Sequence, residues 1–311
     1  MDSPRDMLSA IGRTACVELR CVVPESSARV LVKLETQNPT GSMKDRMALA
    51  VVEGGMKRGL VSPGGRVVEY TGGSTGTSLA FVCAAKGLAI TVVSSDAFSR
   101  EKRDHMRALG AHVVELPSRG GRTTRELIER MIAKARELST VPGAFAADQF
   151  NNPDAAAGYG PLADELWEQS GHALDAFVQS VGTAQCIRGV AGALRTLQPA
   201  VHVAAVEPAE SPVLAGGLPG PHKIEGIGPG FVPPLWSPGL ADEVIPVSTD
   251  EALAMTRRLA REEALFAGTS TGANVVGALR VAARLGRACT VATIACDSGL
   301  KYLSTELYGS A

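Results

Sequence analysis

The hydrophobic pattern of the chain alternates between two kinds of segment. Short runs rich in valine, isoleucine and other apolar residues predict buried strands, and longer runs with apolar residues every three or four positions predict amphipathic helices. The predicted strands are residues 30–34, 66–70, 89–94, 112–116, 176–180, 201–206, 243–247 and 289–294. The predicted helices are residues 45–58, 76–86, 100–109, 123–138, 161–169, 185–197, 249–263 and 272–285.

The repeated alternation of strand and helix predicts an α/β fold whose parallel sheets are covered by helices on both faces. Gly59, Gly87 and Gly110 each follow a predicted helix, which is typical of a helix that ends in a left-handed residue. The polar stretch QFNNPD at residues 149–154 indicates a break after the first half. We therefore predict two doubly wound α/β domains.

The composition excludes several classes of protein. With 31 basic and 32 acidic residues, the chain lacks the positive excess of a non-specific nucleic-acid binder. Its hydrophobic fraction of 45 % is too high for a disordered chain. No apolar run approaches the roughly 20 residues of a membrane helix, and the N-terminus lacks the apolar segment of a signal peptide. We expect a cytoplasmic protein with no nucleic-acid or membrane partner.

Cysteine and glycine sharpen this picture. The six cysteines form no C-x-x-C pair and no zinc-binding spacing, so we predict no metal site and expect small buried thiols in a reducing compartment. The chain has 34 glycines but only 7 Phe, 4 Tyr and 2 Trp. In a globular chain this excess of glycine predicts loops that bring bare backbone close to a ligand.

In α/β folds, ligands bind where loops leave the carboxyl ends of the strands. Six segments near predicted strand ends are rich in glycine, serine and threonine or carry ionisable residues. They are residues 38–46 (NPTGSMKDR), 71–76 (TGGSTG), 181–186 (VGTAQC), 226–231 (GIGPGF), 268–272 (GTSTG) and 295–302 (ACDSGLKY).

Three familiar motifs fit these loops poorly. The dinucleotide motif G-x-G-x-x-G would need a glycine in place of Thr71. The hydrolase motif G-x-S-x-G matches at Ser74 and Ser270, but no histidine follows Ser270, and the histidines after Ser74 lie in no distinctive setting. The P-loop motif fails at Lys44, because neither neighbour of that lysine has the required type.

The segment 38–46 carries the most specific signal. Its Pro-Thr-Gly turn is followed by Ser42, which can cap a helix that has Lys44 in its first turn. A lysine that lies beside the positive end of a helix and is withdrawn from water suits Schiff-base chemistry. The alternative is a solvated surface lysine paired with Asp45, and spacing alone does not separate the two.

The loop at residues 181–186 favours the Schiff-base interpretation of Lys44 over that of a surface lysine. It leaves a predicted strand and begins a predicted helix, so its N–H groups and the Thr183 hydroxyl are placed to hold one phosphate. A lysine, a phosphate-binding loop and further loops suited to a carboxylate together indicate a pyridoxal phosphate site that takes an amino-acid substrate.

From about Ile11 to Tyr308 the chain resembles the cysteine synthase/cystathionine β-synthase family of fold-type II pyridoxal phosphate-dependent enzymes. The matching stretches follow the family order over nearly the full length. They are residues 11–14 (IGRT), 33–35 (KLE), 38–39 (NP), 42–46 (SMKDR), 71–76, 149–150 (QF), 152–153 (NP), 182–183 (GT), 206–208 (VEP), 211–213 (SPV), 222–224 (HKI), 226–231, 268–273, 297–299 (DSG) and 302–305 (YLST).

The resemblance implies a role for each matching residue. Lys44 would hold the cofactor and then act as the catalytic base on the substrate α-proton. The residues implied to bind pyridoxal 5'-phosphate are Lys44, Ser74, Gly182, Thr183, Ala184, Gln185, Cys186 and Ser298, the last beside the pyridine nitrogen. The residues implied to bind the substrate are Thr71, Gly72, Gly73, Ser74, Thr75, Gln149, Gly226, Ile227 and Gly228.

The implied reaction is β-replacement on an activated L-serine, such as O-acetyl- or O-phosphoserine, through an aminoacrylate intermediate to cysteine or another β-substituted alanine. Two alternatives stay open: β-elimination, as in a serine or threonine dehydratase or a cysteine desulfhydrase, and a catalytically impaired partner subunit. Gly72, Ser74 and Cys186 replace the usual serine, asparagine and threonine of the family, which predicts a divergent member.

The resemblance also implies a domain organisation. Residues 1–38 and 150–311 would form a larger cofactor-binding domain, and residues 39–149 a smaller mobile domain that grips the substrate. The cofactor would lie in the cleft between them, and the working form would be a homodimer acting on a small amino acid.

Overall fold

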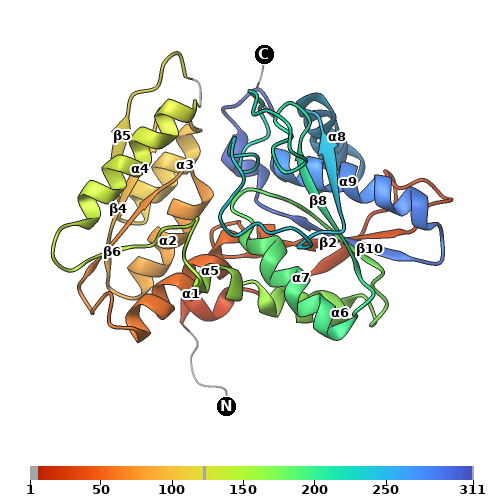
Figure 1. Ribbon diagram of the computed structural model, residues 1–311, viewed down its shortest axis with the longest axis horizontal. Coiled ribbons are helices and arrows are strands. Elements are labelled where there is room, and N and C mark those ends of the chain that lie inside the picture. Colours follow the sequence, from red (N-terminus) through yellow and green to blue (C-terminus); the bar gives the residue numbers. More distant parts are fainter. Residues whose placement is uncertain (1–5, 122–123, 310–311) are drawn as a thin grey trace. The chain divides into compact units, whose positions relative to one another are not determined.

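Two compact units make up the computed structural model, which describes residues 6–121 and 124–309 (Figure 1). Within the described chain, unit 1 contains residues 6–12, 38–158 and 301–309, and unit 2 contains Arg13–Gln37 and Tyr159–Leu300. Each unit is built on its own parallel or mostly parallel sheet. The predicted α/β architecture is therefore confirmed.

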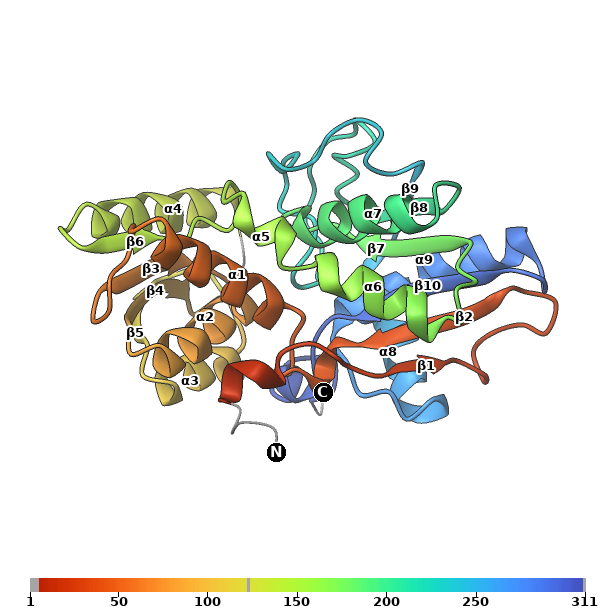
Figure 2. The same ribbon diagram turned by 90° about the horizontal axis from the view of Figure 1, so that it is seen from below.

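Unit 1 contains a fully parallel four-stranded sheet of order β5-β4-β3-β6. Its strands are β3 (Arg66–Tyr70), β4 (Ala89–Ser95), β5 (His112–Leu116) and β6 (Ala144–Ala146). Its helices are α1 (Lys44–Lys57), α2 (Ser74–Ala85), α3 (Arg100–Ala108), α4 (Arg125–Ser139), α5 (Asp154–Ala157) and the short 3-10 helix η1 (Met7–Ala10). Figure 2 shows α4 on one face of this sheet and α1, α2 and α3 on the other.

The core of unit 1 fixes the carboxyl end of β3, from which a glycine-rich loop leaves. Val68 and Tyr70 of β3 and Val93 of β4 pack against Leu127 and Met131 of α4. Val68, Val93 and Met131 are at most 1 % exposed, and burial of such side chains contributes roughly 1.5–3 kcal/mol each. The loop after β3 therefore starts from a rigid base.

The C-terminal segment of the described chain belongs to unit 1. After η3 (Gly299–Tyr302), the backbone N–H and the hydroxyl of Ser304 both donate hydrogen bonds to Glu101 of α3, at 2.6 Å each. The Lys102 ammonium lies 4.1 Å from the centre of the Tyr302 ring, a cation–π contact. These contacts explain why residues 301–309 group with α3. The predicted division into a cofactor-binding and a substrate-gripping domain concerns function and stays a prediction.

Unit 2 contains a six-stranded sheet of order β1-β2-β10-β7-β8-β9, parallel except for the edge pair β1 and β2. Its strands are β1 (Cys16–Glu18), β2 (Arg29–Leu34), β7 (Ala176–Ser180), β8 (His202–Pro208), β9 (Glu243–Val247) and β10 (Thr290–Ala295). Its helices are α6 (Gly160–Gln169), α7 (Gln185–Leu197), α8 (Thr249–Glu262), α9 (Thr269–Leu285) and the 3-10 helix η2 (Glu35–Gln37). Figure 1 draws α8 and α9 on one face of this sheet and α6 and α7 on the other.

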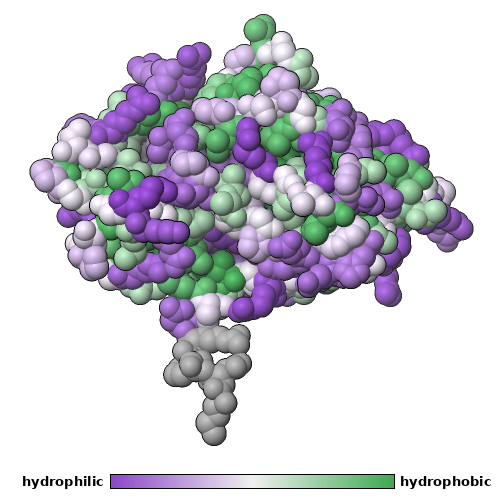
Figure 3. Space-filling view, turned by 60° about the horizontal axis from the view of Figure 1, so that its bottom comes forward, coloured by the Kyte–Doolittle hydropathy of each residue, from purple (hydrophilic) through white to green (hydrophobic). Residues whose placement is uncertain are grey.

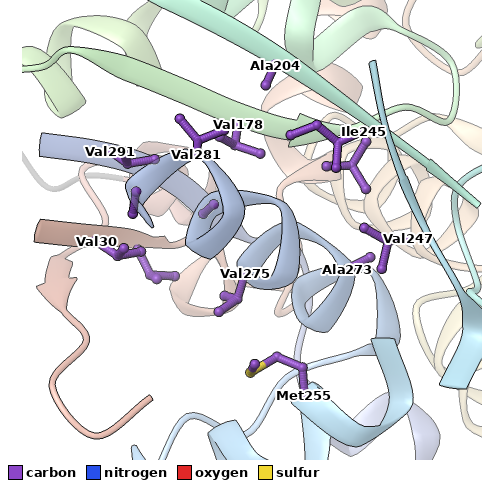
Figure 4. Packing of buried hydrophobic residues seen from close by; sticks show 14 of the residues in the cluster. Val30, Val178, Ala204, Ile245, Val247, Met255, Ala273, Val275, Val281 and Val291 are labelled. Carbon is purple, nitrogen blue, oxygen red and sulfur yellow. The ribbon is translucent and has the colours of Figure 1, made fainter. Parts of the chain in front are cut away.

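Helix α9 is the centre of the unit 2 core (Figure 4). Its Val281 lies near Val178 of β7, while Met255 reaches the same cluster from α8. A Cβ atom added at Gly277 would lie only 2.5 Å from a methyl carbon of Val206, so glycine at this position lets α9 approach the sheet closely. The carboxyl ends of β7 and β10 are thereby held against a buried helix.

Most predicted elements are confirmed, several with the predicted bounds. The matching bounds are those of strands 66–70, 112–116, 176–180 and 243–247 and of helix 185–197. The elements that the pattern did not predict are β1, β6, α5 and the 3-10 helices. Each has only three or four residues, too few for a hydrophobic period to emerge.

Three helix starts differ from the prediction by two or three residues. Helix α2 begins at Ser74 rather than at residue 76, and α9 at Thr269 rather than at residue 272. Their first turns are small polar residues buried by packing, which a search for apolar periodicity passes over. Helix α4 begins at Arg125 with the Thr124 side chain as its N-cap; the predicted start at residue 123 lies outside the described residues.

The described residues include no helix long and apolar enough to cross a membrane. On the face drawn in Figure 3, hydrophobic residues are scattered among hydrophilic ones. Across residues 6–121 and 124–309, no group of three or more His, Cys, Asp or Glu side chains is arranged to hold a metal ion.

Candidate active site

Lys44 is the first residue of α1 and is half-buried. The predicted N-cap at Ser42 was wrong by one residue, because Met43 occupies the N-cap and is already helical in its backbone angles. The Ser42 hydroxyl still accepts a hydrogen bond from the Lys44 N–H, at 3.2 Å. The lysine therefore lies at the amino end of a helix, where backbone N–H groups are oriented toward solvent or a ligand.

Asp45 is fully buried and ties the start of α1 to two neighbouring segments. Its carboxylate accepts hydrogen bonds from the Thr40 backbone N–H at 2.8 Å and from the Thr40 hydroxyl at 2.5 Å. The Thr40 hydroxyl lies 3.3 Å from the Ser78 hydroxyl of α2. Burial raises the pKa of Asp45, while hydrogen bonds from Ser78 and Thr40 act in the opposite direction. This carboxylate fixes α1 and α2 relative to each other beside Lys44.

The loop between β3 and α2 is the second feature of the unit 1 site. Gly73 is the N-cap of α2, and its N–H donates to the Thr71 hydroxyl at 3.0 Å. The Thr75 hydroxyl donates to Gln149 Oε1 at 2.9 Å, and Gln149 Nε2 donates to the Tyr70 carbonyl at 2.8 Å. Gln149 thus braces both ends of the loop, a structural contact that its predicted role in substrate binding did not include.

Glu69 lies directly beneath this loop, and sequence reasoning missed it. It is 2 % exposed, and its carboxyl accepts hydrogen bonds from the N–H groups of Tyr70 and Gln149, at 2.9 Å each. Burial raises the pKa of Glu69 to about 8; the two N–H groups lower it and the nearby Asp148 raises it. The available signal was an acidic residue inside the buried part, VVEY, of the predicted strand.

In unit 2, the loop between β7 and α7 has the geometry of an anion site. Ala184, the N-cap of α7, adopts a left-handed conformation with φ +64° and ψ −1°. A left-handed residue followed by a helix start makes successive N–H groups converge, and the positive end of the helix dipole favours an anion there. Among the described residues the buried Ser180 hydroxyl, at the end of β7, has no hydrogen-bond partner.

A second loop abuts this one. The Gly228 N–H donates to the Val181 carbonyl at 3.0 Å, and a Cβ atom added at Gly182 would overlap the Gly226 carbonyl oxygen. His222 Nε2 lies 2.9 Å from the Gly228 carbonyl oxygen. The residues of 226–228 predicted to bind substrate and those of 182–186 predicted to bind phosphate are therefore neighbours within unit 2.

Ser298 lies just after β10, and its hydroxyl accepts a hydrogen bond from the Leu300 N–H at 3.3 Å. A buried amide that sequence reasoning missed holds the preceding strand ends. Asn274 of α9 accepts from the Ser180 N–H at 2.7 Å and donates to the Ile294 carbonyl at 2.8 Å and to Gln179 at 3.1 Å. The ends of β7 and β10 are thereby fixed by one side chain.

The predicted site residues thus fall into two groups. Unit 1 contains Lys44 and joins Gln149 to the loop from Thr71 to Thr75. Unit 2 brings together residues 182–186 and 226–228, and it also contains Ser298. Within these groups, residues 71–75 and 182–186 lie at helix starts that follow strand ends, the position expected of ligand sites in α/β folds.

Comparison with known proteins gives a consistent result over nearly the whole chain. The family model described as pyridoxal-phosphate dependent enzyme matches residues 7–297. A cysteine synthase of Staphylococcus aureus is 43 % identical over 303 residues, which cover 96 % of this chain and 95 % of that protein.

Solved structures of similar proteins agree with this match. An O-ureido-L-serine synthase is 37 % identical with a TM-score of 0.91, covering 99 % of this chain and 98 % of the other. An O-acetylserine dependent cystathionine β-synthase from Helicobacter pylori is also 37 % identical with a TM-score of 0.91, covering 99 % and 100 %.

Proposed function

The chain belongs to the family of pyridoxal-phosphate dependent enzymes, and we propose that it catalyses β-replacement on an activated L-serine. The substrate is of the O-acetyl- or O-phosphoserine type, and the product is cysteine or another β-substituted alanine. Similar proteins support this proposal, because a cysteine synthase, an O-ureido-L-serine synthase and an O-acetylserine dependent cystathionine β-synthase are all named for β-substituted alanines or their precursors.

One observation in unit 1 carries the proposal furthest. The contacts of Asp45 with Thr40, and of Thr40 with Ser78, hold Lys44 and the α2 start in fixed relation. A lysine amine that removes a proton from Cα needs the substrate carboxylate fixed nearby, because proton transfer depends on position. The N–H groups and hydroxyls at the start of α2 are suited to fix that carboxylate.

The residues of unit 2 fit a cofactor phosphate. The left-handed Ala184 and the first N–H groups of α7 form the kind of concave backbone that binds phosphate. We assign the phosphate to residues 182–186, the pyridine nitrogen to Ser298, the phenolic oxygen to Ser74 and the aldehyde carbon to Lys44. When bound, pyridoxal 5'-phosphate supplies an electron sink for negative charge at the substrate Cα.

The substrate steps fall to residues of both groups. Residues 71–75 and Gln149 bind the substrate carboxylate, and residues 226–228 exclude water from the bound substrate. Lys44 takes the Cα proton as the bond from Cβ to the acetate or phosphate oxygen breaks. The nucleophile then forms its bond to Cβ, and Lys44 returns the proton to Cα. The leaving group departs as acetate or phosphate.

The test separates replacement from elimination. Purified protein loaded with pyridoxal 5'-phosphate is incubated with O-acetyl-L-serine, O-phospho-L-serine or L-serine, each with and without sulfide or homocysteine. We expect mass spectrometry to detect cysteine or cystathionine with an activated serine, with little pyruvate in the absence of a nucleophile.

Three results would decide against the proposal. Pyruvate as the main product under all conditions would show elimination. No reaction with any serine derivative by a protein that binds the cofactor would favour an impaired partner subunit. We expect Lys44→Ala to lower kcat by about a thousandfold. Full activity in this variant would show that Lys44 is not the catalytic base.

We also propose that the working form is a homodimer in the cytoplasm that takes a small amino acid as its substrate. All six cysteines are free thiols, which fits a reducing compartment. Light scattering on the eluted peak of a size-exclusion column measures the mass. A single 32.2 kDa species at working concentration would contradict the dimer.

A further inference from the structure

Gly72 and Gly73 of the loop between β3 and α2, and Gly76 in the first turn of α2, lie against three side chains spaced four residues apart. A Cβ atom added at Gly72 would lie 2.7 Å from Cε1 of Phe98. One added at Gly73 would overlap Cδ of Lys102, and one added at Gly76 would overlap Sδ of Met106. Residues four apart lie on one face of a helix, so a single stripe on and just before α3 shapes the loop.

Packing limits how far this stripe can move aside. Phe98 is half-buried and packs against the cluster that includes Tyr70 and Leu127, and Met106 is 0 % exposed. Lys102 is 4 % exposed, and its ammonium is placed over the Tyr302 ring. Side chains that are packed in this way resist displacement, and overpacking such a site costs about 1–3 kcal/mol.

We propose that Phe98 is a positioning residue for the substrate-binding loop and that it is the reason for glycine at position 72. The phenyl ring occupies the volume that a side chain at residue 72 would need, so the two positions form a coupled pair. The loop would then bind the substrate carboxylate with backbone N–H groups in a conformation set by the ring. This inference rests on the proposed function, because the loop is taken to hold a carboxylate.

If residues 72 and 98 compete for the same space, a smaller side chain at position 98 should restore what a larger one at position 72 impairs. Phe98→Val removes Cδ1, Cε1 and Cζ, the three ring atoms nearest to an added Cβ, and keeps an apolar branched side chain. Gly72→Ser should weaken binding of O-acetyl-L-serine and lower the unfolding temperature when the phenyl ring is present. It should change neither property much when the ring is absent. Two positions that do not interact would instead show losses that add in the double variant.

The experiment compares the wild type, Gly72→Ser, Phe98→Val and the double variant, all loaded with pyridoxal 5'-phosphate. Titration with O-acetyl-L-serine, followed by the change in cofactor absorbance, gives the dissociation constant, and steady-state kinetics give KM and kcat. Thermal unfolding of the same proteins reports the coupling without substrate. Gly192→Ser is the matched control, since nothing lies within 4 Å of an added Cβ at that exposed position of α7.

We expect Gly72→Ser to weaken binding of O-acetyl-L-serine and raise KM about tenfold, with kcat changed less than about threefold. Phe98→Val should change KM less than about threefold, and the double variant should return to the Phe98→Val value in both KM and unfolding temperature. The control should match the wild type in KM and in the dissociation constant.

Two results would overturn the inference while the proposed function stands. Additive losses in the double variant would show that the two positions are not coupled. Non-additive changes in unfolding temperature with unchanged dissociation constants would show that Phe98 has a purely structural role. A wild type that responds to no serine derivative would instead overturn the proposed function, and this inference with it.

Discussion

The two strand-to-helix loops of the candidate site both end in an N-cap residue with positive φ but are built from different residues. In unit 1, the loop between β3 and α2 has Gly72 and Gly73, and the first turn of α2 has Gly76; each packs against a side chain of the stripe formed by Phe98, Lys102 and Met106. In unit 2, the loop between β7 and α7 takes its left-handed turn at Ala184, and its glycine at Gly182 packs against the backbone of a neighbouring loop. In unit 1, close side chains require glycine at Gly72 and Gly76, and at Gly73 a positive φ of 158° adds to the contact with Lys102.

The strands beneath these loops also differ. β3 carries Glu69, a buried carboxyl that accepts two backbone hydrogen bonds, and burial raises its pKa to about 8. β7 carries Gln179, a fully buried amide that donates to the Ser180 carbonyl at 3.2 Å and accepts from Asn274. The buried side chain beneath the unit 1 loop, Glu69, therefore titrates, whereas the one beneath the unit 2 loop, Gln179, does not.

The largest expected effect is the pH dependence that Glu69 gives to unit 1. Between pH 4.5, the ordinary pKa of a glutamate, and about 8, folded Glu69 keeps a proton that the unfolded chain has released. Stability should therefore be greatest below this window and fall as pH rises through it. The fall from pH 5 to pH 8 is on the order of 4 kcal/mol, measured by hydrogen exchange of the Arg66–Tyr70 peptide.

Glu69→Gln should remove most of this slope, because an amide does not titrate. Glu168→Gln, on the exposed face of α6, is the control and should keep the wild-type slope. A wild-type strand that is equally protected at pH 5 and pH 8 would show that Glu69 is ionised throughout.

The next largest effect is the loss of stability when a glycine of unit 1 that lies against a side chain is replaced. Gly76→Ala would place Cβ in overlap with Met106 Sδ and 2.6 Å from Thr71 Cγ2, so we expect a loss of about 3 kcal/mol in the free energy of unfolding. Gly192→Ala, in an exposed turn of α7 with open space around it, should gain about 0.5–1 kcal/mol. Urea unfolding of both variants checks this contrast, and equal effects would sink the packing argument.

A somewhat smaller effect is expected from the amide that holds unit 2. Asn274→Ala removes the acceptor of the Ser180 N–H and the donor to the Ile294 carbonyl. Leaving these buried groups unsatisfied should cost about 2 kcal/mol and weaken cofactor binding, because the strand ends carry residues 182–186 and Ser298. Equilibrium dialysis with pyridoxal 5'-phosphate measures the second effect. Asn151→Ala, at an exposed amide, should leave it unchanged.

The smallest effect concerns the left-handed turn itself. Ala184→Gly relieves the steric cost of a positive φ at a non-glycine residue, and we expect a net gain of about 0.5 kcal/mol in the free energy of unfolding. Ala264→Gly, at φ +55° outside the candidate site, should give a similar gain. A loss of several tenths of a kcal/mol or more at Ala184 alone would mean that its methyl group, rather than its backbone, matters.

The sequence predicted what depends on local order along the chain. The apolar run at Arg66–Tyr70 indicated a strand, and the motif around Lys44 indicated a lysine at a helix start. Hydrogen bonds between distant positions were not predictable: Glu69 binds the N–H of Gln149, 80 residues away, and Asn274 binds that of Ser180, 94 residues away. No local pattern encodes such partners.

The same limit applies to the glycines of residues 71–76. Their number suggested backbone that faces a ligand, whereas the contacts with Phe98, Lys102 and Met106 give a second reason for them. Those side chains lie about 26–30 residues further along the chain. Only the folded arrangement of β3, α2 and α3 brings them against the loop.

The measurement that tests the account most directly is the identity of the lysine that binds the cofactor. The protein is loaded with pyridoxal 5'-phosphate, reduced with borohydride to make the attachment permanent, digested and examined by peptide mass spectrometry. The account predicts the phosphopyridoxyl group on Lys44 and its loss in Lys44→Ala. Attachment at another lysine, such as Lys33, Lys102 or Lys301, or no attachment at all, would contradict it.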